Sequence, residues 1–528
     1  MNSVDTYIRT DTGELDDMVP LVASFLEKNI LDLVIDGRTV RGYRTPDARS
    51  LWIRDYSDML RGIRYFEPDV RSVVDHFAET QAASGRIFDY VTTFPERPPG
   101  ERENWTRYVR VPVEADVEFR LVKAAWLAWQ ATGDIEWIRS LIPALEKALG
   151  YTTRHPWRWD SGHGLVKRPY TIDTWDFAYT AGKHDWLQFQ INEDTYWGIM
   201  HGDNSGYCEA FRILARFHQR LGNPEAAREW SVRADRLRDA LNRVCWNGRF
   251  YTHFVKLSEV DIPGVDEESQ LSLSNPMAIN RGAAGHERAV AILDEYRARG
   301  RRKGGFAEWF SIDPPFPGGV FGDDRLVPGA YVNGGIMPLV GGELALAALE
   351  HGREKYGVEI LKRYHDIICA SGESYLWYFP DGRPSGIETS TSPEATPTDG
   401  WGSTAMLHAL MTGLAGVQDR DRLFRRVRLC PRWPAAGVRR ADVRTGYAAS
   451  GAFFEYSIEY GESSIRLEMS GRDADVEVHL LLPEGGSADS VRAGGLALDF
   501  DVSRMEESIY LDFTTRGISR TEVRIGLS

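Results

Sequence analysis

Two acidic residues stand among aromatic side chains in the segment from Arg168 to Tyr179, whose sequence is RPYTIDTWDFAY. Asp173 and Asp176 are separated by Thr and Trp175. An apolar wall raises the pKa of a carboxyl group until it holds a proton near neutral pH, and a sugar ring stacks its C–H face on Trp or Tyr. The segment therefore suits a general acid that acts on a carbohydrate. The alternative is a packed aromatic loop with a solvated Asp.

A second stretch, from Leu51 to Tyr56, places a guanidinium and a carboxylate directly after a tryptophan. Arg54 and Asp55 can together hold sugar hydroxyls by bidentate hydrogen bonds, and Trp52 offers a face for stacking. An ordinary ion pair at the start of a helix is the alternative.

Polar, glycine-rich turns form the third group of candidates. The segment MHGDNS contains His201 and Asp203, and Asn333 is followed by two glycines. Such turns ahead of long helices can present side chains and backbone amides to a ligand. Simple N-capping by Asp203 or Asn204 is the alternative interpretation.

If a glycosidic bond is hydrolysed with inversion, a second carboxylate must activate a water molecule, and it must lie roughly 6.5–9.5 Å from the acid. The stretch from Trp377 to Trp401 offers Glu388 and Glu394 in a loop rich in Ser, Thr and Pro. Glu308, next to Trp309, is a rival base. Any of the three carboxylates can instead serve only to bind sugar.

The composition excludes several classes of protein. The chain has 528 residues and a net charge of −14, which argues against nucleic acid or an anionic membrane as the main partner. The four cysteines are far apart and lack CxxC spacing, so neither a zinc site nor a disulfide framework is indicated. The sequence shows no cofactor motif, and we expect no cofactor and no metal. With no apolar stretch at the N-terminus, we expect a cytoplasmic protein.

The elements that must position these residues are helices. Apolar residues recur at three- and four-residue spacing from about residue 15 to residue 416, in units of long helix, glycine-containing turn and second helix. The hairpins share no fixed repeat length, which favours closure into an α/α barrel over an open solenoid. The pattern predicts eleven helical segments, at 15–29, 50–66, 69–82, 113–131, 135–151, 207–221, 225–244, 287–299, 341–349, 358–369 and 402–414.

The long linkers between the hairpins carry most of the tryptophans. Long loops in compact domains are usually functional, and aromatic side chains at one rim would line a cleft. The alternative is that large loops need aromatic residues in order to pack. The tryptophans concerned are Trp105, Trp157, Trp159, Trp175, Trp186, Trp309, Trp377 and Trp401.

Beyond about residue 420 the pattern changes to short β-rich segments with alternating polarity, bounded by Gly, Ser and Asp. We therefore predict a mainly α fold with two domains, an (α/α)6 barrel of helix hairpins at residues 1–420 and a small β-sandwich at 421–528. No catalytic motif stands out in the second domain, whose expected role is to brace the barrel.

The chain resembles the six-hairpin glycosidases, the (α/α)6-barrel superfamily that includes glycoside hydrolase families 63, 37, 15, 65, 78 and 94. The likeness covers most of the chain and is locally greatest to families 63 and 37. Thr174 to Phe177 is similar to the loop that provides the general acid in those families, which implies that Asp176 is the acid. Glu388, ahead of Gly400 and Trp401, resembles the family base, although Thr and Ser follow it where the families have an aromatic residue.

Other parts of the sequence depart from any single family. The stretch from Trp52 to Asp55 looks more like the Arg-Asp sugar clamp of families 15, 65 and 94. The N-terminal β-domain common to several of these families is not expected, because a helix is predicted from residue 15.

These features favour an inverting exo-glycosidase that hydrolyses a small α-linked gluco-oligosaccharide or glucoside. Asp176 would protonate the leaving oxygen and Glu388 would activate water. Three alternatives stay open: an α-L-rhamnosidase-type hydrolase, a glycoside phosphorylase on the same barrel, and a non-catalytic carbohydrate-binding protein. The partner expected in each case is a small carbohydrate, with the sugar, the linkage and the oligomeric state left open.

Overall fold

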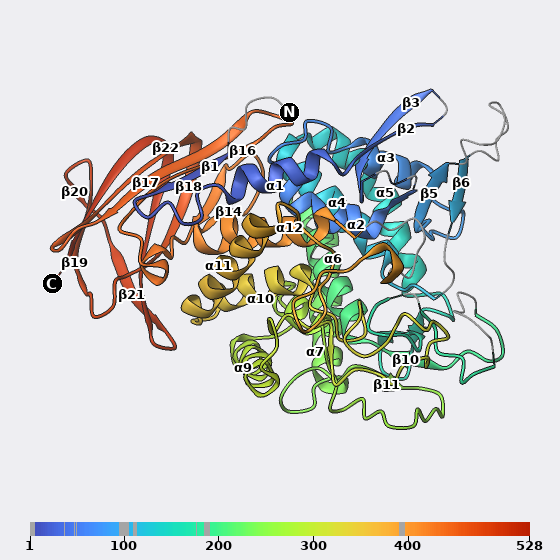
Figure 1. The fold of residues 1–528 in the computed structure, drawn as a ribbon. Coiled ribbons are helices and arrows are strands. Elements are labelled where there is room, and N and C mark those ends of the chain that lie inside the picture. Colours follow the sequence, from blue (N-terminus) through green and yellow to red (C-terminus); the bar gives the residue numbers. More distant parts are fainter. Residues whose placement is uncertain are drawn as a thin grey trace.

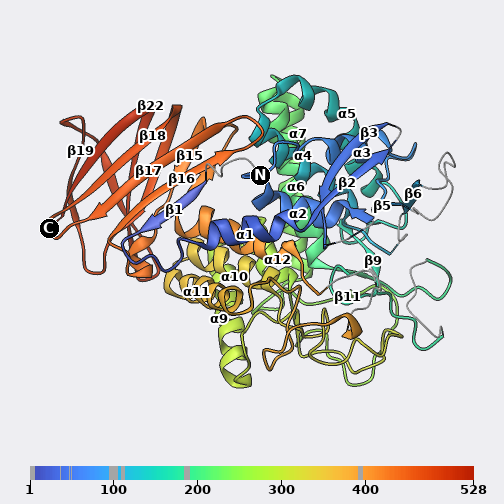
Figure 2. The same cartoon turned by 45° about the horizontal axis from the view of Figure 1, so that its top comes forward.

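The computed structural model describes residues 6–35, 37–46, 48, 50–93, 105–108, 113–175, 177–183, 191–389 and 397–527, with the backbone alone for residues 93 and 105–108. It consists of a helical part and a large sheet that lies on one side of it (Figures 1 and 2). Within the described residues, no helix is both long enough and apolar enough to cross a membrane.

Among the described residues, six helices form a closed inner ring in which each helix contacts the next and the last contacts the first. Closure gives every inner helix two neighbours, so it is buried on most sides. In chain order the ring consists of α2 (Ile53–Ile63), α4 (Val117–Thr132), α6 (His201–Arg220), α8 (Ser274–Asn280), α10 (Pro338–Glu350) and α12 (Gly400–His408).

The other six helices in the described part of the chain pack outside the ring against its members. They alternate with the inner helices along the chain, as expected for helix hairpins. They are α1 (Met18–Glu27), α3 (Ser72–Glu79), α5 (Ile135–Thr152), α7 (Pro224–Val244), α9 (His286–Lys303) and α11 (Glu354–Ser371).

The pair α4 and α5 shows why the sequence forms such hairpins. Nearly every residue of α4 is buried, in keeping with its content of Ala, Leu and Trp. Gly133 ends α4 in the left-handed conformation at φ 70°, which suits a residue without a Cβ. Asp134 then caps α5, because its side chain accepts a hydrogen bond from the backbone N–H of Trp137.

Close packing of α4 on α6 depends on the missing side chain of Gly206. A Cβ at this position would lie 2.3 Å from the ring of Phe119. We expect Gly206→Ala to lower the free energy of unfolding by about 1–3 kcal/mol, since the ring or a helix must shift. Urea unfolding followed by circular dichroism measures this loss. Gly305→Ala, where the nearest atom is 3.5 Å away, is the control; equal losses for the two variants would contradict the packing argument.

The predicted helices are found with shifted ends, with one addition and one extension. The short helix α8 was not predicted, and α6 begins at His201 rather than at residue 207. Asp203 and Asn204 therefore lie inside the first turn of α6, and the N-cap is Met200, so the interpretation of either residue as an N-cap was wrong. Helix α12 continues as a π-helical turn, Ala409–Leu414.

The β-rich C-terminal part forms one ten-stranded sheet, so the molecule is a mixed α and β structure rather than a mainly α one. The strand pairs in it are antiparallel except for β15 with β18. Its strands are β14 (Val417–Asp419), β15 (Arg426–Leu429), β16 (Arg440–Tyr447), β17 (Ala452–Tyr460), β18 (Ser464–Leu481), β19 (Ala488–Ala493), β20 (Leu496–Ala497), β21 (Phe500–Met505), β22 (Ser508–Leu527) and, from the other end of the chain, β1 (Tyr7–Thr10).

The strand β1 was not foreseen. It pairs with β16 in antiparallel register, with Tyr7 opposite Arg444, and lies as a blue strand at the edge of the sheet, next to the orange β16 (Figures 1 and 2). Residues on both sides of the predicted boundary at 420 thus belong to one sheet. The buried apolar side chains of helices and sheet also form one continuous cluster. The division into two domains stays a prediction.

Short strands occupy the connections of the helical part. The hairpin β2 (Ile30–Ile35) and β3 (Arg38–Tyr43) follows α1, and β4 (Ser50–Trp52) pairs with β5 (Tyr90–Thr93), which pairs with β6 (Trp105–Tyr108). The remaining ones are β7 (Trp159–Asp160), β8 (Leu165–Val166), β9 (Arg168–Pro169), β10 (Trp197–Ile199), β11 (Val255–Lys256), β12 (Leu271–Ser272) and β13 (Ile312–Asp313).

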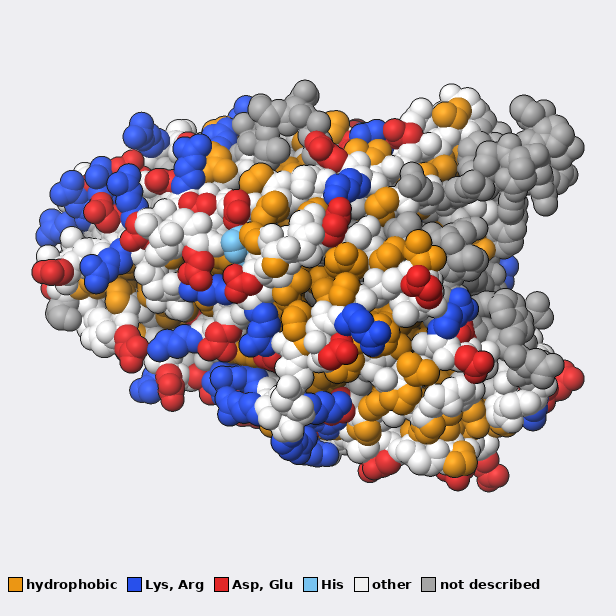
Figure 3. Space-filling view, viewed as in Figure 1, with side chains coloured by type: hydrophobic (Ala, Val, Ile, Leu, Met, Phe, Trp, Pro, Cys, Tyr) orange, Lys and Arg blue, Asp and Glu red, His pale blue; other side chains and the backbone are white. Residues whose placement is uncertain are grey.

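The negative net charge is not spread evenly over the surface. Basic side chains gather over α9, at the lower middle of Figure 3, where the last turn of this helix carries Arg301, Arg302 and Lys303. Positive charge at a helix C-terminus is favourable because it faces the negative end of the helix dipole. We therefore attribute these residues to the stability of α9.

Candidate functional site

The N-terminal ends of the inner helices bring most of the predicted residues to one end of the ring. Arg54 lies in the first turn of α2, Asp203 in the first turn of α6 and Trp401 in the first turn of α12. The positive ends of the helix dipoles therefore meet there, which stabilises carboxylates. The loop from Arg168 to Trp175 is joined to the same end by hydrogen bonds.

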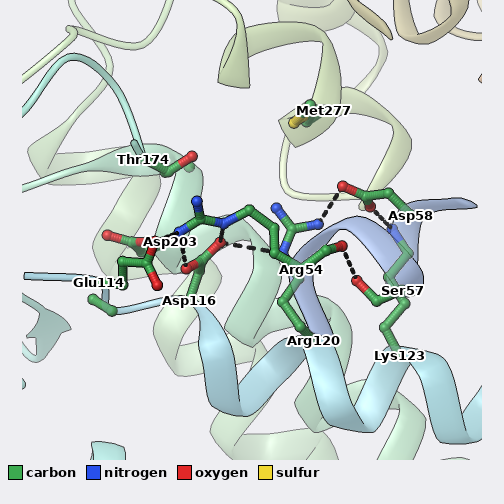
Figure 4. Close-up of polar contacts among 12 residues, drawn as sticks. Arg54, Ser57, Asp58, Glu114, Asp116, Arg120, Lys123, Thr174, Asp203 and Met277 are labelled. Carbon is green, nitrogen blue, oxygen red and sulfur yellow. Dashed lines mark hydrogen bonds and ion pairs between the residues drawn. The ribbon is translucent and has the colours of Figure 1, made fainter. Parts of the chain in front are cut away.

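A buried network of charges forms the centre of this end (Figure 4). The guanidinium of Arg54 donates two hydrogen bonds of 2.9 Å to Asp116 and lies 2.8 Å from the carboxylate of Glu114. Arg120 also contacts Asp116, at 3.2 Å, and lies 2.6 Å from Asp58. All of these side chains are at most 5% exposed. We call Arg54, Asp58, Glu114, Asp116 and Arg120 the charge cluster.

The protonation states in the cluster follow from its pairing. Burial alone would raise the pKa of Asp58, but the charges of Arg120 and Lys123 outweigh it and hold that pKa well below its ordinary range. For Asp116 burial is likewise outweighed, and Arg54 and Arg120 lower its pKa strongly. Both aspartates are therefore ionised hydrogen-bond acceptors at neutral pH.

Asp203 differs from these two aspartates. Burial raises its pKa to about 6, although the charge of Arg168, 3.2 Å away, opposes the shift. The negative charge of Asp116 adds to the increase. Figure 4 shows Asp203 beside Glu114, on the side of the Arg54 guanidinium. Asp203 thus combines complete burial with a pKa of about 6, a combination typical of groups in functional sites.

An aromatic wall stands against the charge cluster. The ring centroids of Trp175 and Trp401 are 5.5 Å apart, and the angle between the two ring planes is 33°. The indole N–H of Trp401 donates a hydrogen bond of 3.2 Å to the carboxylate of Asp58. The indole N–H of Trp175 donates to the hydroxyl of Tyr331 over 3.0 Å. The ring centroid of Tyr331 in turn lies 6.4 Å from that of Trp377. The wall therefore joins three of the predicted tryptophans from segments distant in sequence.

The loop before Trp175 is fixed by its own hydrogen bonds. Asp173 has a left-handed backbone, with φ 46°, which is costly for a residue with a side chain. Its carboxylate accepts hydrogen bonds from the hydroxyl and the N–H of Ser274, and its N–H donates to Nε2 of His253 over 2.8 Å. Arg168 donates to the carbonyl of Trp175. The bonds to Ser274 hold the loop against α8, and the ion pair of Arg168 with Asp203 holds it against α6.

His201 completes the surroundings of Asp173. Its Nδ1 is 3.1 Å from the carbonyl of Thr252, and its Nε2 has no hydrogen-bond partner among the described residues. Burial lowers the pKa of His201, so its imidazole is neutral at neutral pH. Burial raises the pKa of Asp173, but the electrostatic interaction with His201 and hydrogen bonding from serine side chains outweigh burial, so the net pKa is lowered.

Arg54 and Asp55 lie at the start of α2 and do not pair with each other; Arg54 pairs with Glu114 and Asp116. Asp55 pairs with Arg44, whose guanidinium also lies 4.2 Å above the ring of Trp52. Trp52 stacks on Tyr90 at 4.6 Å. A direct contact of Arg54 or Asp55 with sugar stays a prediction, because both charges already have protein partners.

Three predicted residues make contacts away from the charge cluster. Glu308 pairs with Arg363 of α11 at 3.0 Å, and Trp309 is fully buried. The side chain of Asn333 bonds to the backbone of Phe316 and Leu326 and so holds a loop. Asp176 and Glu394 lie outside the described residues. Glu388 is exposed in a short 3-10 helix, Ile387–Thr389.

The sequence reasoning missed most of the charge cluster. Asp58, Glu114, Asp116 and Arg120 were not predicted as site residues. A signal was present in α4, where Glu118, Arg120 and Lys123 interrupt a run of Val, Leu, Ala and Trp that a buried helix requires. Charged residues in an otherwise apolar helix indicate buried pairs, since isolated buried charges are too costly.

Glu118, close to Asp116 along the chain, gives a test of these electrostatics. Burial raises its pKa to about 7, against the opposing charge of Arg158. Between about pH 4.5 and 7 the folded protein therefore holds a proton that the unfolded chain has lost, so stability falls as pH rises through this window. We expect Glu118→Gln to remove up to about 3 kcal/mol of this pH dependence.

Urea unfolding of wild type and Glu118→Gln at several pH values between 4.5 and 7 measures the difference. Glu136→Gln, at a side chain that is 74% exposed, serves as the control and should follow wild type. Parallel curves for wild type and Glu118→Gln would show that Glu118 does not titrate in this window.

Among the described residues, one set of three side chains lies close enough together to share a metal ion. It consists of Asp17, His365 and Cys369, which lie between α1 and α11 and outside the charge cluster. All four cysteines of the chain are free thiols.

No protein-family model matches the sequence, and no curated protein matches it. Solved structures do match. An α-L-rhamnosidase from Dictyoglumus thermophilum aligns over 99% of this chain and 51% of its own, with 13% identity and a TM-score of 0.60. The α-L-rhamnosidase from Streptomyces avermitilis, solved with L-rhamnose, aligns over 98% and 42%, with 14% identity and a TM-score of 0.60.

A second kind of match is the family 63 mannosylglycerate hydrolase from Thermus thermophilus, solved with glucose. It aligns over 75% of this chain and 99% of its own, with 15% identity and a TM-score of 0.51. The chain spans about half the length of the rhamnosidases that it matches. At these identities the likeness concerns the fold, and it confirms the predicted resemblance: the chain has the fold of the six-hairpin glycosidases.

Proposed function

We propose that this protein is a glycoside hydrolase whose active site lies at the charge cluster and the aromatic wall. The observation that carries the proposal is the position of Trp175, Trp401 and Tyr331 against ionised, buried carboxylates at the end of the ring where the inner helices begin. Flat aromatic faces and fixed polar acceptors are what a sugar ring and its hydroxyls require. The six-hairpin fold supports the assignment.

The proposed reaction is hydrolysis with inversion of configuration. Asp176 protonates the leaving oxygen and Glu388 activates a water molecule on the opposite face of the sugar. Trp175 and Phe177, the chain neighbours of Asp176, are both buried, which favours an acid in apolar surroundings. The exposure of Glu388 is compatible with access to water.

The charge cluster would act indirectly in this scheme. Arg54 and Arg120 neutralise Asp116 and Asp58, and Asp58 fixes the ring of Trp401 through the indole N–H. A wall held in this way keeps its shape when sugar binds, so little ordering free energy is lost on binding. The cluster residues are therefore proposed as positioning residues.

We also propose a specific architecture for the helical part and a role for the sheet. The ring of helices corresponds to an (α/α)6 barrel, and the C-terminal sheet braces it through the continuous apolar cluster. We also propose that the protein is cytoplasmic.

The proposed substrate is a small α-linked gluco-oligosaccharide or glucoside. An α-L-rhamnoside is the second candidate, because the matched rhamnosidase structures align over 92–99% of this chain, including its C-terminal sheet, with TM-scores of 0.58–0.60. The match to the family 63 mannosylglycerate hydrolase, whose structure contains glucose, covers 75% of the chain.

The test is a product time course followed by NMR on α- and β-glucosides, trehalose, kojibiose, rhamnosides and glucosylglycerate, with and without phosphate. Release of a free sugar with inverted configuration supports the proposal and identifies the sugar. A strict requirement for phosphate would instead identify a phosphorylase. Tight binding of a panel member without any turnover would identify a carbohydrate-binding protein.

A further inference from the structure

Three side chains of different chemistry converge on one point between α1 and α11. Nε2 of His365 is 2.5 Å from Oδ1 of Asp17 and 3.4 Å from Sγ of Cys369. One ligand atom from each of the three residues lies within 4.8 Å of the others. His365 and Cys369 are four positions apart on α11 and so share one face of that helix.

The geometry distinguishes this cluster from a nucleophilic triad. In such a triad the imidazole contacts the nucleophile through one ring nitrogen and the carboxylate through the other. Here the thiol and the carboxylate both approach Nε2. Convergence of sulfur, nitrogen and oxygen on one point is instead the arrangement that surrounds a bound cation.

The residues are held near one another by contacts outside the cluster. Glu14 pairs with Lys362 at 2.6 Å, one turn of α11 before His365, and Lys28 pairs with Glu373 beyond its end. Helix α1 is thus attached to α11 on both sides of Asp17. Asp17 is the N-cap residue of α1, yet its side chain makes no capping hydrogen bond and points to His365 instead.

We propose that Asp17, His365 and Cys369 bind a divalent first-row metal ion, with Zn²⁺ as the expected occupant. Thiolate, imidazole and carboxylate are the ligands that zinc prefers, and hard cations such as Mg²⁺ or Ca²⁺ avoid thiolates. The three protein ligands leave the fourth tetrahedral position to water. This site is separate from the charge cluster and does not rest on the proposed hydrolase activity.

The spacing suits tetrahedral zinc after a small adjustment. Bond lengths of about 2.0–2.3 Å place neighbouring ligand atoms about 3.3–3.6 Å apart. The separation of Cys369 Sγ from His365 Nε2, 3.4 Å, already falls in this range. The carboxylate of Asp17 must move outward by less than about 1 Å, which is easy because this side chain is 58% exposed.

Metal binding here would fasten the N-terminal segment to the helical ring. Asp17 follows β1, which pairs with β16 in the C-terminal sheet, and His365 belongs to α11, which packs on α10 of the ring. A metal bond between them would connect the sheet, through this segment, to the helices. We therefore expect binding to raise the unfolding temperature.

The experiment uses the reduced protein, residues 1–528, with Zn²⁺ or Co²⁺ alone. Titration calorimetry should give one Zn²⁺ per chain, and Co²⁺ should produce a thiolate-to-cobalt charge-transfer band. Cys369→Ser should abolish this band. His365→Gln and Asp17→Asn should weaken Zn²⁺ binding by more than about tenfold, since loss of a group that merely hydrogen-bonds to a metal ligand already costs about 10–100-fold in metal affinity.

His163→Gln is the matched control. His163 also contacts an aspartate, Asp160, at 2.8 Å, but no thiol lies in that contact, so this variant should bind Zn²⁺ like wild type. Zn²⁺ should raise the unfolding temperature of wild type and of this control, and not that of Cys369→Ser. The proposal is overturned if wild type does not bind Zn²⁺ saturably, or if Cys369→Ser keeps the cobalt band.

Discussion

The substitution Arg54→Met is expected to lower the free energy of unfolding by about 3–5 kcal/mol, the cost of removing one partner from a buried ion pair. Arg54 lies between Glu114 and Asp116, both with fully buried carboxylates. Methionine fills a similar volume but removes the guanidinium from between these two carboxylates, and Arg120 still pairs with Asp116. Urea unfolding followed by circular dichroism measures the loss.

Two further variants show that the loss comes from uncompensated charge. Arg38→Met removes an exposed pair with Glu79, in which the arginine side chain is 74% exposed, and should change stability by less than about 1 kcal/mol. The double variant Arg54→Met/Glu114→Gln also removes the negative charge of Glu114 and should therefore recover part of the lost stability. A double variant as unstable as Arg54→Met would contradict the electrostatic explanation.

The substitution Asp176→Asn should reduce turnover of the substrate found by NMR by about 10²–10⁴-fold, the usual contribution of a general acid. Asn has nearly the same size but carries no acidic proton, so substrate binding should change little. The loss should therefore appear in kcat, with KM nearly constant.

The control for Asp176→Asn is Asp194→Asn, which removes a partly exposed carboxylate paired with Lys183. This variant should keep the activity of wild type. Substrates with very acidic leaving groups, which need little protonation, should be hydrolysed by Asp176→Asn with a smaller loss. Full activity of Asp176→Asn on natural-type substrates would exclude Asp176 as the acid.

The helical part could be predicted because its apolar residues recur with the helical period. Helix α4 is the clearest case, since its Ala, Leu and Trp residues are buried by neighbours on several sides. Helix α8 was not predicted because its seven residues are too few for a periodic signal. Its first turn also contains Ser, Asn and Pro. Yet α8 joins α6 to α10, and the ring would be open without it.

The site could be predicted only in part, for a physical reason. Aromatic residues in long loops gave a visible signal, and Trp175, Trp377 and Trp401 do meet at one wall. The partners of Arg54 could not be read from the sequence, because Asp116 is 62 positions away and directly precedes α4. Ion pairs between helices depend on packing, which short-range periodicity does not encode.

The same reason explains why the cysteine spacing gave no indication of a metal site. Cys369 has His365 four positions before it, but the third group, Asp17, is 348 residues from that histidine. A search for closely spaced cysteines finds sites built from one segment. A site between the first and the eleventh helix becomes visible only when the ring has brought them together.

Pairing of β1 with β16 imposes an order on folding during synthesis. Thr6 hydrogen-bonds to Gly446, a partner that leaves the ribosome 440 residues later. At about 5–20 residues per second, β16 is synthesised roughly 20–90 s after β1. During that time the backbone groups of β1 can bind other chains or chaperones. A similar delay separates the synthesis of α1 from that of α11. We therefore expect the helical ring to form an intermediate on the ribosome and the termini to join last.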